Sequence, residues 1–188
     1  MTTTVPILFI TGPVGVGKTS VAGEISEQLD KAGVAHAFVD IDSLRWCYPR
    51  PPHDRFHTEL GMKNLAVVWR NFQVAGAACL VLVDVLESRD VLERYRAAIP
   101  GAEFLVVRLR AEPHTLASRV QARELGSGLE WHLQRTAELA TQMDRSQVED
   151  LLVDTEGKSI TAIAREILER SKWHGIFPQS MDRFEREE

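Results

Sequence analysis

Near the amino end of the chain stands Gly12-Pro13-Val14-Gly15-Val16-Gly17-Lys18-Thr19, which matches the pattern G-x-x-x-x-G-K-[ST] and directly follows the apolar run 5–10. A glycine-rich loop between a strand and a helix points successive backbone N–H groups at phosphate oxygens, and the helix dipole favours the same negative charge. The lysine then reaches the β- and γ-phosphates, while the threonine hydroxyl binds Mg²⁺. We therefore expect ATP and Mg²⁺ as cofactors. The nucleotide-binding residues predicted here are Gly12, Pro13, Val14, Gly15, Val16, Gly17, Lys18, Thr19 and Ser20.

The composition is that of one globular domain, which we assign to residues 1–188. A formal charge of -5, from 22 basic and 27 acidic residues, argues against a general nucleic-acid binder. Cys47 and Cys79 stand in no metal-binding spacing and are expected as reduced thiols. The chain shows no basic leader before residue 5 and no apolar run near about 18 residues. We therefore expect a cytoplasmic protein with no membrane partner.

Strand-like and helix-like segments alternate through the chain, which is typical of an α/β fold built on a parallel sheet. A fully apolar run such as 78–83 suits a strand with helices over both of its faces. We predict three layers, α/β/α, around a five-stranded parallel sheet. The expected strands are 5–10, 35–41, 78–83, 104–109 and 151–153, and the expected helices lie at about 21–33, 65–76, 88–99, 113–123, 129–143 and 159–168.

Polar residues directly follow three of the predicted strands. Asp40 and Asp42 come after the second strand, Asp84 after the third, and Asp154-Thr155 after the fifth. Because ligands bind beyond the carboxyl ends of parallel strands, we expect these residues to meet the phosphate loop at one rim. Transfer of a phosphoryl group needs a carboxylate near the acceptor oxygen to take its proton. Asp42 is our choice for this base, and Asp40 is the second choice.

A pair of arginines precedes the Gly/Ser-rich stretch 124–128. Arg119 and Arg123 lie one helical turn apart, so their guanidinium groups share a helix face and can both reach the phosphates when that stretch closes. A charge clamp of this type is worth about 10³ to 10⁵ in the rate of phosphoryl transfer. We predict a short lid over about 119–131.

The segment 45–62 follows the proposed base and is expected to form the acceptor side of the site. It mixes aromatic and polar side chains, which suits a partly apolar or ring-containing small molecule. His53 and His57 lie four residues apart and could ligate a metal on a helix, but the neighbouring prolines favour a loop instead.

The order of these motifs resembles the small P-loop kinases of the nucleoside-monophosphate-kinase-like group, and most of all the branch that contains chloramphenicol phosphotransferase. The similarity covers approximately 7–168. It implies a P-loop kinase fold with a short lid, in which Asp42 is the base for the acceptor hydroxyl. The residues that carry this likeness are Ile41-Asp42-Ser43-Leu44, followed by Pro49. The resemblance also places Asp84 near Mg²⁺ or the acceptor, and an adenine-contacting loop at 154–158.

The residues and the resemblance together predict the following roles. The catalytic residues are Asp42, Lys18, Arg119 and Arg123. Nucleotide contacts beyond the phosphate loop come from Arg119 and Thr155. The metal ligands are Thr19, Asp42 and Asp84. The substrate contacts are Asp40, Asp42, Arg45, Tyr48 and Asp84.

These motifs favour an ATP-dependent phosphotransferase that acts on a hydroxyl of a small metabolite or antibiotic-like molecule. The alternative is a nucleotide-binding regulatory or interaction protein that passes no phosphoryl group on. An adenylylsulfate kinase is a minor alternative, because Asp40-x-Asp42-x-x-Arg45 is similar to the D-G-D-N-V-R segment of that group. A nucleotide kinase is another, although no F-P-R-like stretch follows Asp84. The tail 173–188 either folds back over the sheet or contacts a second subunit, so a homodimer stays open.

Overall fold

The computed structural model describes residues 4–50, 52–54, 56–123 and 128–171. Within them the strands form one parallel sheet in the order β2-β3-β1-β4-β5. The five-stranded parallel sheet expected from the sequence is confirmed. The strands are β1 (Val5–Thr11), β2 (His36–Asp40), β3 (Cys79–Val83), β4 (Ala102–Arg110) and β5 (Leu151–Asp154).

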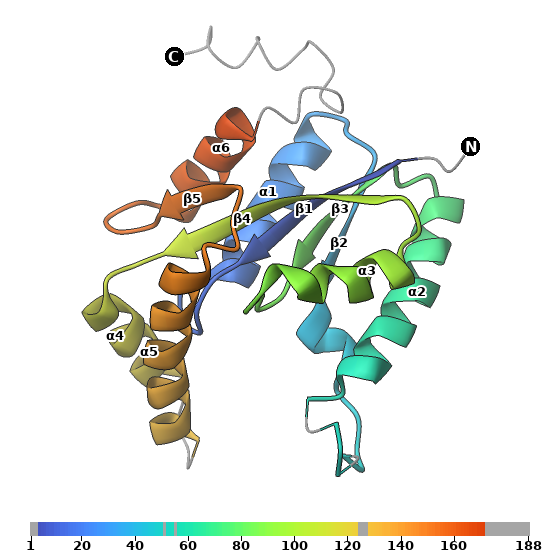
Figure 1. Ribbon diagram of the computed structural model, residues 1–188. Coiled ribbons are helices and arrows are strands. Elements are labelled where there is room, and N and C mark those ends of the chain that lie inside the picture. The colour runs from blue at the N-terminus through green and yellow to red at the C-terminus, as the bar shows by residue number, and fades with distance from the viewer. Residues whose placement is uncertain (1–3, 51, 55, 124–127, 172–188) are drawn as a thin grey trace, which may run out of the picture.

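Helices cover both faces of the sheet and make three layers (Figure 1). Helices α1 and α6 pack on one face, and α2 and α3 pack on the other. All five side chains of β3 are buried, as a strand between two helical layers requires. The helices are α1 (Lys18–Lys31), α2 (Thr58–Val74), α3 (Leu92–Ala98), α4 (Pro113–Arg123), α5 (Leu129–Ser146) and α6 (Ile160–Arg170), with short 3-10 turns η1 (Ile41–Leu44) and η2 (Arg89–Val91).

Helix α2 begins at Thr58, well before the apolar pattern that predicted it starts at Leu65. The cause is a carboxylate upstream of the helix. Oδ1 of Asp54 accepts from the backbone N–H of Thr58 at 2.8 Å, and Oδ2 accepts from that of Glu59 at 3.0 Å. A side chain that satisfies two first-turn N–H groups stabilises a helix start without any apolar periodicity.

The order of the strands explains where the site lies. The chain leaves β1 toward β2 and leaves β4 toward β5, in opposite directions, so a topological switch point lies between β1 and β4. The phosphate loop follows β1, and α4 follows β4. Helices α4 and α5 and the loop that leads into α2 all project beyond the carboxyl edge of the sheet (Figure 1).

Residues 124–127 of the predicted lid and the whole of the predicted tail, 173–188, fall outside the described residues. Across the part of the chain that is described, no helix combines the length and the apolar character that a membrane span requires.

Candidate active site

Two glycines of the phosphate loop leave no room for a side chain. Gly15 has φ 82°, and a Cβ there would lie 2.8 Å from Cγ2 of Val120 and 3.1 Å from the carbonyl oxygen of Leu116. Both neighbours belong to α4. Gly12 has φ 145°, and its Cβ would lie 2.6 Å from the carbonyl oxygen of Leu109 in β4. The loop is therefore held closely between α4 and the sheet.

Helix α1 begins directly after this loop, and its first backbone N–H groups are hydrogen-bond donors at the end of the loop. Its N-cap residue is Gly17, at φ 98°, and no side chain caps it. Ser159, by contrast, caps α6 by accepting from the backbone N–H of Ala162 at 3.2 Å. Because the first N–H groups of a helix have no partners within it, those of α1 can bind an anion. The phosphates of a nucleotide fit this arrangement.

Two cations of the predicted site lie against the loop. Nζ of Lys18 donates to the carbonyl oxygens of Gly12, at 2.9 Å, and Pro13, at 3.1 Å. Nη1 of Arg119 donates to the carbonyl oxygen of Val16 at 3.3 Å. Arg119 therefore lies beside the phosphate loop, although its helix is distant in sequence. Arg123 ends α4, but its side chain lies outside the described part of the structure.

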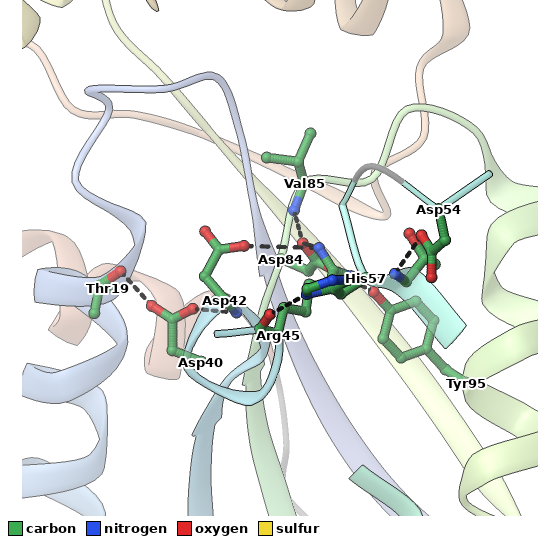
Figure 2. Close-up of polar contacts among 10 residues, drawn as sticks. Thr19, Asp40, Asp42, Arg45, Asp54, His57, Asp84, Val85 and Tyr95 are labelled. Carbon is green, nitrogen blue, oxygen red and sulfur yellow. Dashed lines mark hydrogen bonds and ion pairs between the residues drawn. The ribbon is translucent and has the colours of Figure 1, made fainter. Parts of the chain in front are cut away.

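A hydroxyl and a carboxylate meet at the start of α1. Oγ1 of Thr19 donates to Oδ2 of Asp40 at 2.7 Å (Figure 2). The proton thus points at the carboxylate, and the oxygen lone pairs remain for a cation. Magnesium in phosphoryl-transfer sites takes only one or two protein oxygens besides phosphate and water, so this pair fits it. Asp40 is thus hydrogen-bonded to Thr19, and the predicted metal roles of Thr19, Asp42 and Asp84 stay predictions.

No group of three or more His, Cys, Asp or Glu side chains forms a metal cluster within the described residues. The hydrogen bond from Thr19 also places Asp40 next to the helix that follows the phosphate loop. The substrate contact predicted for Asp40 stays a prediction.

Asp42, the predicted base, lies in the turn η1 directly after β2. Its backbone N–H donates to Oδ1 of Asp40 at 3.1 Å, and its carboxylate lies 3.6 Å from Nη1 of Arg45. Partial desolvation raises the pKa of Asp42, and the charges of Asp84 and Asp40 raise it further, while Arg45 and Lys18 lower it. The side chain is nevertheless 79% exposed, so it is surrounded by protein at longer range but open to solvent on one side. A carboxylate that is accessible and more basic than usual suits proton abstraction.

Asp84 lies at the centre of a buried network, and its predicted metal and acceptor roles stay predictions. Its Oδ1 accepts from Nη1 of Arg45 at 3.2 Å and from the N–H of Val85 at 2.8 Å. Its Oδ2 accepts from Nη2 of Arg45 at 2.5 Å and from the hydroxyl of Tyr95 (Figure 2). Burial, followed by the charge of Asp84, raises the pKa of Tyr95. Both oxygens of Asp84 are thus occupied in holding Arg45 beside Asp42.

Gly61 in the first turns of α2 makes room for that arginine. A Cβ at this position would lie 2.9 Å from Cγ and 3.0 Å from Nε of Arg45. The arginine side chain therefore crosses the helix where the helix has no side chain of its own. Sequence reasoning missed Gly61, because nothing near it in the chain marks it as a contact.

The structure separates two other predicted residues from the site. Thr155 is buried, and both its backbone N–H and its hydroxyl donate to the carbonyl oxygen of Arg110, at 2.8 Å and 3.0 Å. It secures the end of β5 and presents no side chain to a nucleotide, whereas its neighbours 156–158 are exposed. Tyr48 points into solvent and lies outside the pocket beside the base.

That pocket has a volume of about 140 Å³ and lies next to the predicted base. Two of its lining residues, Asp42 and Arg45, are predicted substrate contacts. A third, His57, was not among the predicted substrate contacts. Its lining residues are Asp42, Arg45, Trp46, Arg50, Phe56 and His57.

A further arginine, which we did not predict, lies on the lid side. Arg135 in α5 forms an ion pair with Glu87, which follows β3. The next residue, Thr136, donates its hydroxyl to the carbonyl oxygen of His132 at 2.7 Å, and that hydroxyl lies 3.5 Å from the carbonyl oxygen of Val14 in the phosphate loop. Arg135 thus links α5 to the loop after β3, and only the spatial proximity of two segments distant in sequence identifies it.

Comparison with known families agrees with this geometry. Residues 8–147, well over half of the chain, match the family described as AAA domain. The chain belongs to this AAA domain family. The match spans the phosphate loop, the acids after β2 and β3, and helices α4 and α5. No curated protein matches this chain in sequence.

Solved structures extend the comparison. A gluconokinase from Sinorhizobium meliloti 1021 is 22% identical, with a TM-score of 0.58 over 87% of this chain and 90% of that one. The tunicamycin resistance protein of Deinococcus radiodurans is 17% identical, with a TM-score of 0.59 over 89% and 95%. The Mycobacterium tuberculosis APS kinase, solved with AMPPNP and APS, is 21% identical, with a TM-score of 0.58 over 90% and 98%. This chain therefore has the P-loop kinase fold.

Proposed function

We propose that this protein is an ATP- and Mg²⁺-dependent phosphotransferase that moves the γ-phosphoryl group to a hydroxyl of a small molecule. One observation carries the proposal. Two acids connect the amino end of α1 with the pocket that Arg45 and His57 line. Asp40 is hydrogen-bonded to Thr19 in α1, and Asp42 lines the pocket. A phosphate site and an acceptor pocket thus flank a carboxylate of raised pKa.

The proposed reaction divides the work between the two sides of the rim. Asp42 takes the proton of the acceptor hydroxyl, whose oxygen forms a new bond to the γ-phosphorus as the bond to the ADP oxygen breaks. A general base of this kind is typically worth about 10² to 10⁴ in rate. Lys18 and Arg119 hold the charge that gathers on the phosphate oxygens, and Thr19, supported by Asp40, is the protein oxygen that holds Mg²⁺.

Several features support a kinase over a nucleotide-binding regulatory protein. Such a regulator has no need of a basic carboxylate between its nucleotide and a side pocket. The structural neighbours named for a reaction act on different acceptors, gluconate in one case and APS in another, so they do not choose the acceptor here. The pocket's mixed lining suits a small metabolite or antibiotic-like compound with both polar and apolar parts. The free thiols of Cys47 and Cys79 suit the cytoplasmic location that we propose.

The test is acceptor-dependent release of ADP. We expect a panel of hydroxylated metabolites and antibiotics with Mg·ATP to give at least one product heavier by a single phosphate. In Asp42→Asn, turnover of that acceptor should fall by about 10² to 10⁴ while Mg·ATP affinity stays close to that of the wild type. Tight nucleotide binding with no acceptor dependence over a broad panel would favour the regulatory alternative.

A further inference from the structure

His57 has an unusual place for a histidine. It precedes the first residue of α2, is only 3% exposed, and has a left-handed backbone at φ 50°, which is uncommon for a residue other than glycine. Its Nδ1 lies 2.8 Å from the carbonyl oxygen of Arg45, and His57 is among the residues that line the pocket beside Asp42. Strained backbone of this kind is concentrated at functional sites.

The hydrogen bond to Arg45 determines which proton the ring carries. A carbonyl oxygen can only accept, so Nδ1 carries the hydrogen, and in the neutral ring Nε2 presents a lone pair. Nε2 is buried and has no hydrogen-bond partner among the residues that the structure describes. Nε of Arg45, another residue that lines the pocket, is also buried without a partner in that part of the chain. Buried polar atoms are nearly always satisfied, so an acceptor atom of this kind requires a donor.

A purely structural role accounts for only half of the ring. Asparagine tolerates the left-handed conformation better than histidine does, and its side-chain amide can donate to a carbonyl as Nδ1 does. The bond to Arg45 therefore explains Nδ1, but it does not explain why the ring carries a second nitrogen, Nε2. The second nitrogen distinguishes histidine from asparagine at this position.

We propose that Nε2 of His57 accepts a hydrogen bond from a second hydroxyl of the acceptor molecule, so that the acceptor is a polyhydroxylated compound. This inference rests on the proposed function and narrows its substrate class. One hydroxyl gives its proton to Asp42 and receives the phosphoryl group, while another is held by His57. A compound with a single hydroxyl satisfies Asp42 but leaves Nε2 buried and unpaired, which costs binding.

The pocket beside His57 is bordered by aromatic side chains that are open to solvent. Trp46 and Phe56 line the pocket and are 92% and 55% exposed. Displacement of Trp46, which buries very little area, costs little free energy. Nδ1, in contrast, is tied to the backbone of Arg45, so the ring stays fixed while the pocket admits a ligand.

The first test observes the ring directly. Protein labelled with ¹⁵N-histidine is titrated, in the presence of Mg·ADP, with glycerol, myo-inositol, D-gluconate and shikimate, and with cyclohexanol as the single-hydroxyl control. The signal of His57 is assigned from its loss in His57→Asn. We expect the Nδ1–H form and a saturable shift of Nε2 with at least one polyol but not with cyclohexanol. A hydrogen on Nε2, no response to any polyol, or an equal response to cyclohexanol would overturn the proposal.

The second test separates contact from scaffolding. His57→Asn keeps the left-handed residue and the donor to Arg45 but removes Nε2, and the exposed His53→Asn in the same loop is the matched control. We expect His57→Asn to bind the responsive polyol about 10- to 100-fold more weakly, with Mg·ADP affinity unchanged and the melting temperature within about 3 °C of the wild type. His53→Asn should behave as the wild type. A merely structural histidine predicts equal polyol binding in all three proteins.

The two proposals fail differently in the same experiments. A polyol that is phosphorylated equally well by the wild type and His57→Asn overturns the role of His57 and leaves the phosphotransferase intact. A polyol that binds at His57 but never gains a phosphate, with Mg·ATP present, supports the contact and removes the phosphotransferase.

Discussion

The nucleotide side and the acceptor side of the rim are built in different ways. The phosphate loop relies on backbone: glycines at positive φ, the uncapped first turn of α1, and carbonyl oxygens that hold Lys18. The acceptor side relies on side chains from four segments, with Asp84 and Tyr95 fixing Arg45 and with His57 behind it. A backbone site tolerates change in the surrounding side chains, whereas a side-chain network depends on each member.

Because of this difference, the nucleotide side can stay the same while the acceptor side changes with the molecule that it binds. Any nucleoside triphosphate presents the same phosphates, so a fixed backbone cradle serves the whole class. Acceptors differ in shape and polarity, and a pocket lined by Trp46, Arg50 and Phe56 in an exposed loop can change without disturbing the sheet. Each prediction below should therefore affect one side and leave the other unchanged.

The largest effect is expected from removal of the buried charge at Asp84. In Asp84→Asn the guanidinium of Arg45 loses its principal partner inside the protein, and breaking a buried pair in this way costs about 3–5 kcal/mol of the free energy of unfolding. Urea denaturation measures this loss. The added stability that saturating Mg·ATP gives should be the same as in the wild type, since it depends only on nucleotide affinity.

Glu93→Gln is the matched control for that variant, because it breaks the exposed pair between Arg96 and Glu93. Its cost should stay below about 1 kcal/mol. If both variants lost the same small amount, the buried network would not be what supports the acceptor side.

The nucleotide side should show the opposite result. In Lys18→Ala, loss of the ammonium that pairs with phosphate should weaken Mg·ATP binding about 10- to 100-fold, the value of one or two charge-assisted hydrogen bonds. Because Lys18 is only partly buried, unfolding without nucleotide should change by less than about 1 kcal/mol. Titration calorimetry measures the first quantity and urea denaturation the second. The exposed Lys31→Ala, in the same helix, should change neither.

A smaller effect, of unusual sign, is expected at Gly61. Alanine in a helix is normally more stable than glycine by about 1 kcal/mol. At Gly61 its Cβ would collide with the anchored Arg45, at a cost of about 1–3 kcal/mol, so the net change should be destabilising. Gly23→Ala in α1 should be stabilising, because the new Cβ would have no described atom within 4 Å apart from its chain neighbours and the backbone of its own helix. Stabilisation of equal size in both variants would show that Arg45 is free to move aside.

The same contrast explains what the sequence could predict. The phosphate loop, the layers and the helix bounds of α4 follow from local patterns, because backbone sites are made by consecutive residues. The acceptor side joins Arg45 to Asp84, 39 positions away, and to Gly61, which no periodicity marks. Thr155, whose place at a strand end suggested a ligand contact, donates its hydroxyl to the carbonyl oxygen of Arg110 at the end of the sheet, a bond that no local pattern predicts. The local sequence pattern predicts that each of these residues lies at the rim. The direction of each side chain depends on tertiary packing, which the local pattern does not contain.

The smallest expected effect is a dependence on pH that belongs to the acceptor side. Partial desolvation, and then the charges of Asp84 and Asp40, raise the pKa of Asp42 above its unfolded value. The folded protein therefore holds this proton more tightly, and the stability that it contributes is present at low pH and lost as the pH rises through the raised pKa. Because the side chain is 79% exposed, water screens these charges and the loss should be well under about 1 kcal/mol.

Catalysis should follow the opposite direction, because a base works only when deprotonated. The acid limb of kcat/KM should therefore lie above the usual aspartate pKa of about 3.9. In Asp42→Asn both the limb and the small pH-dependent loss of stability should disappear, which pH profiles of turnover and of urea denaturation measure. An acid limb that survives unchanged in Asp42→Asn, at whatever residual rate, would assign the titrating base to another group on the rim, with Asp40 the next to test.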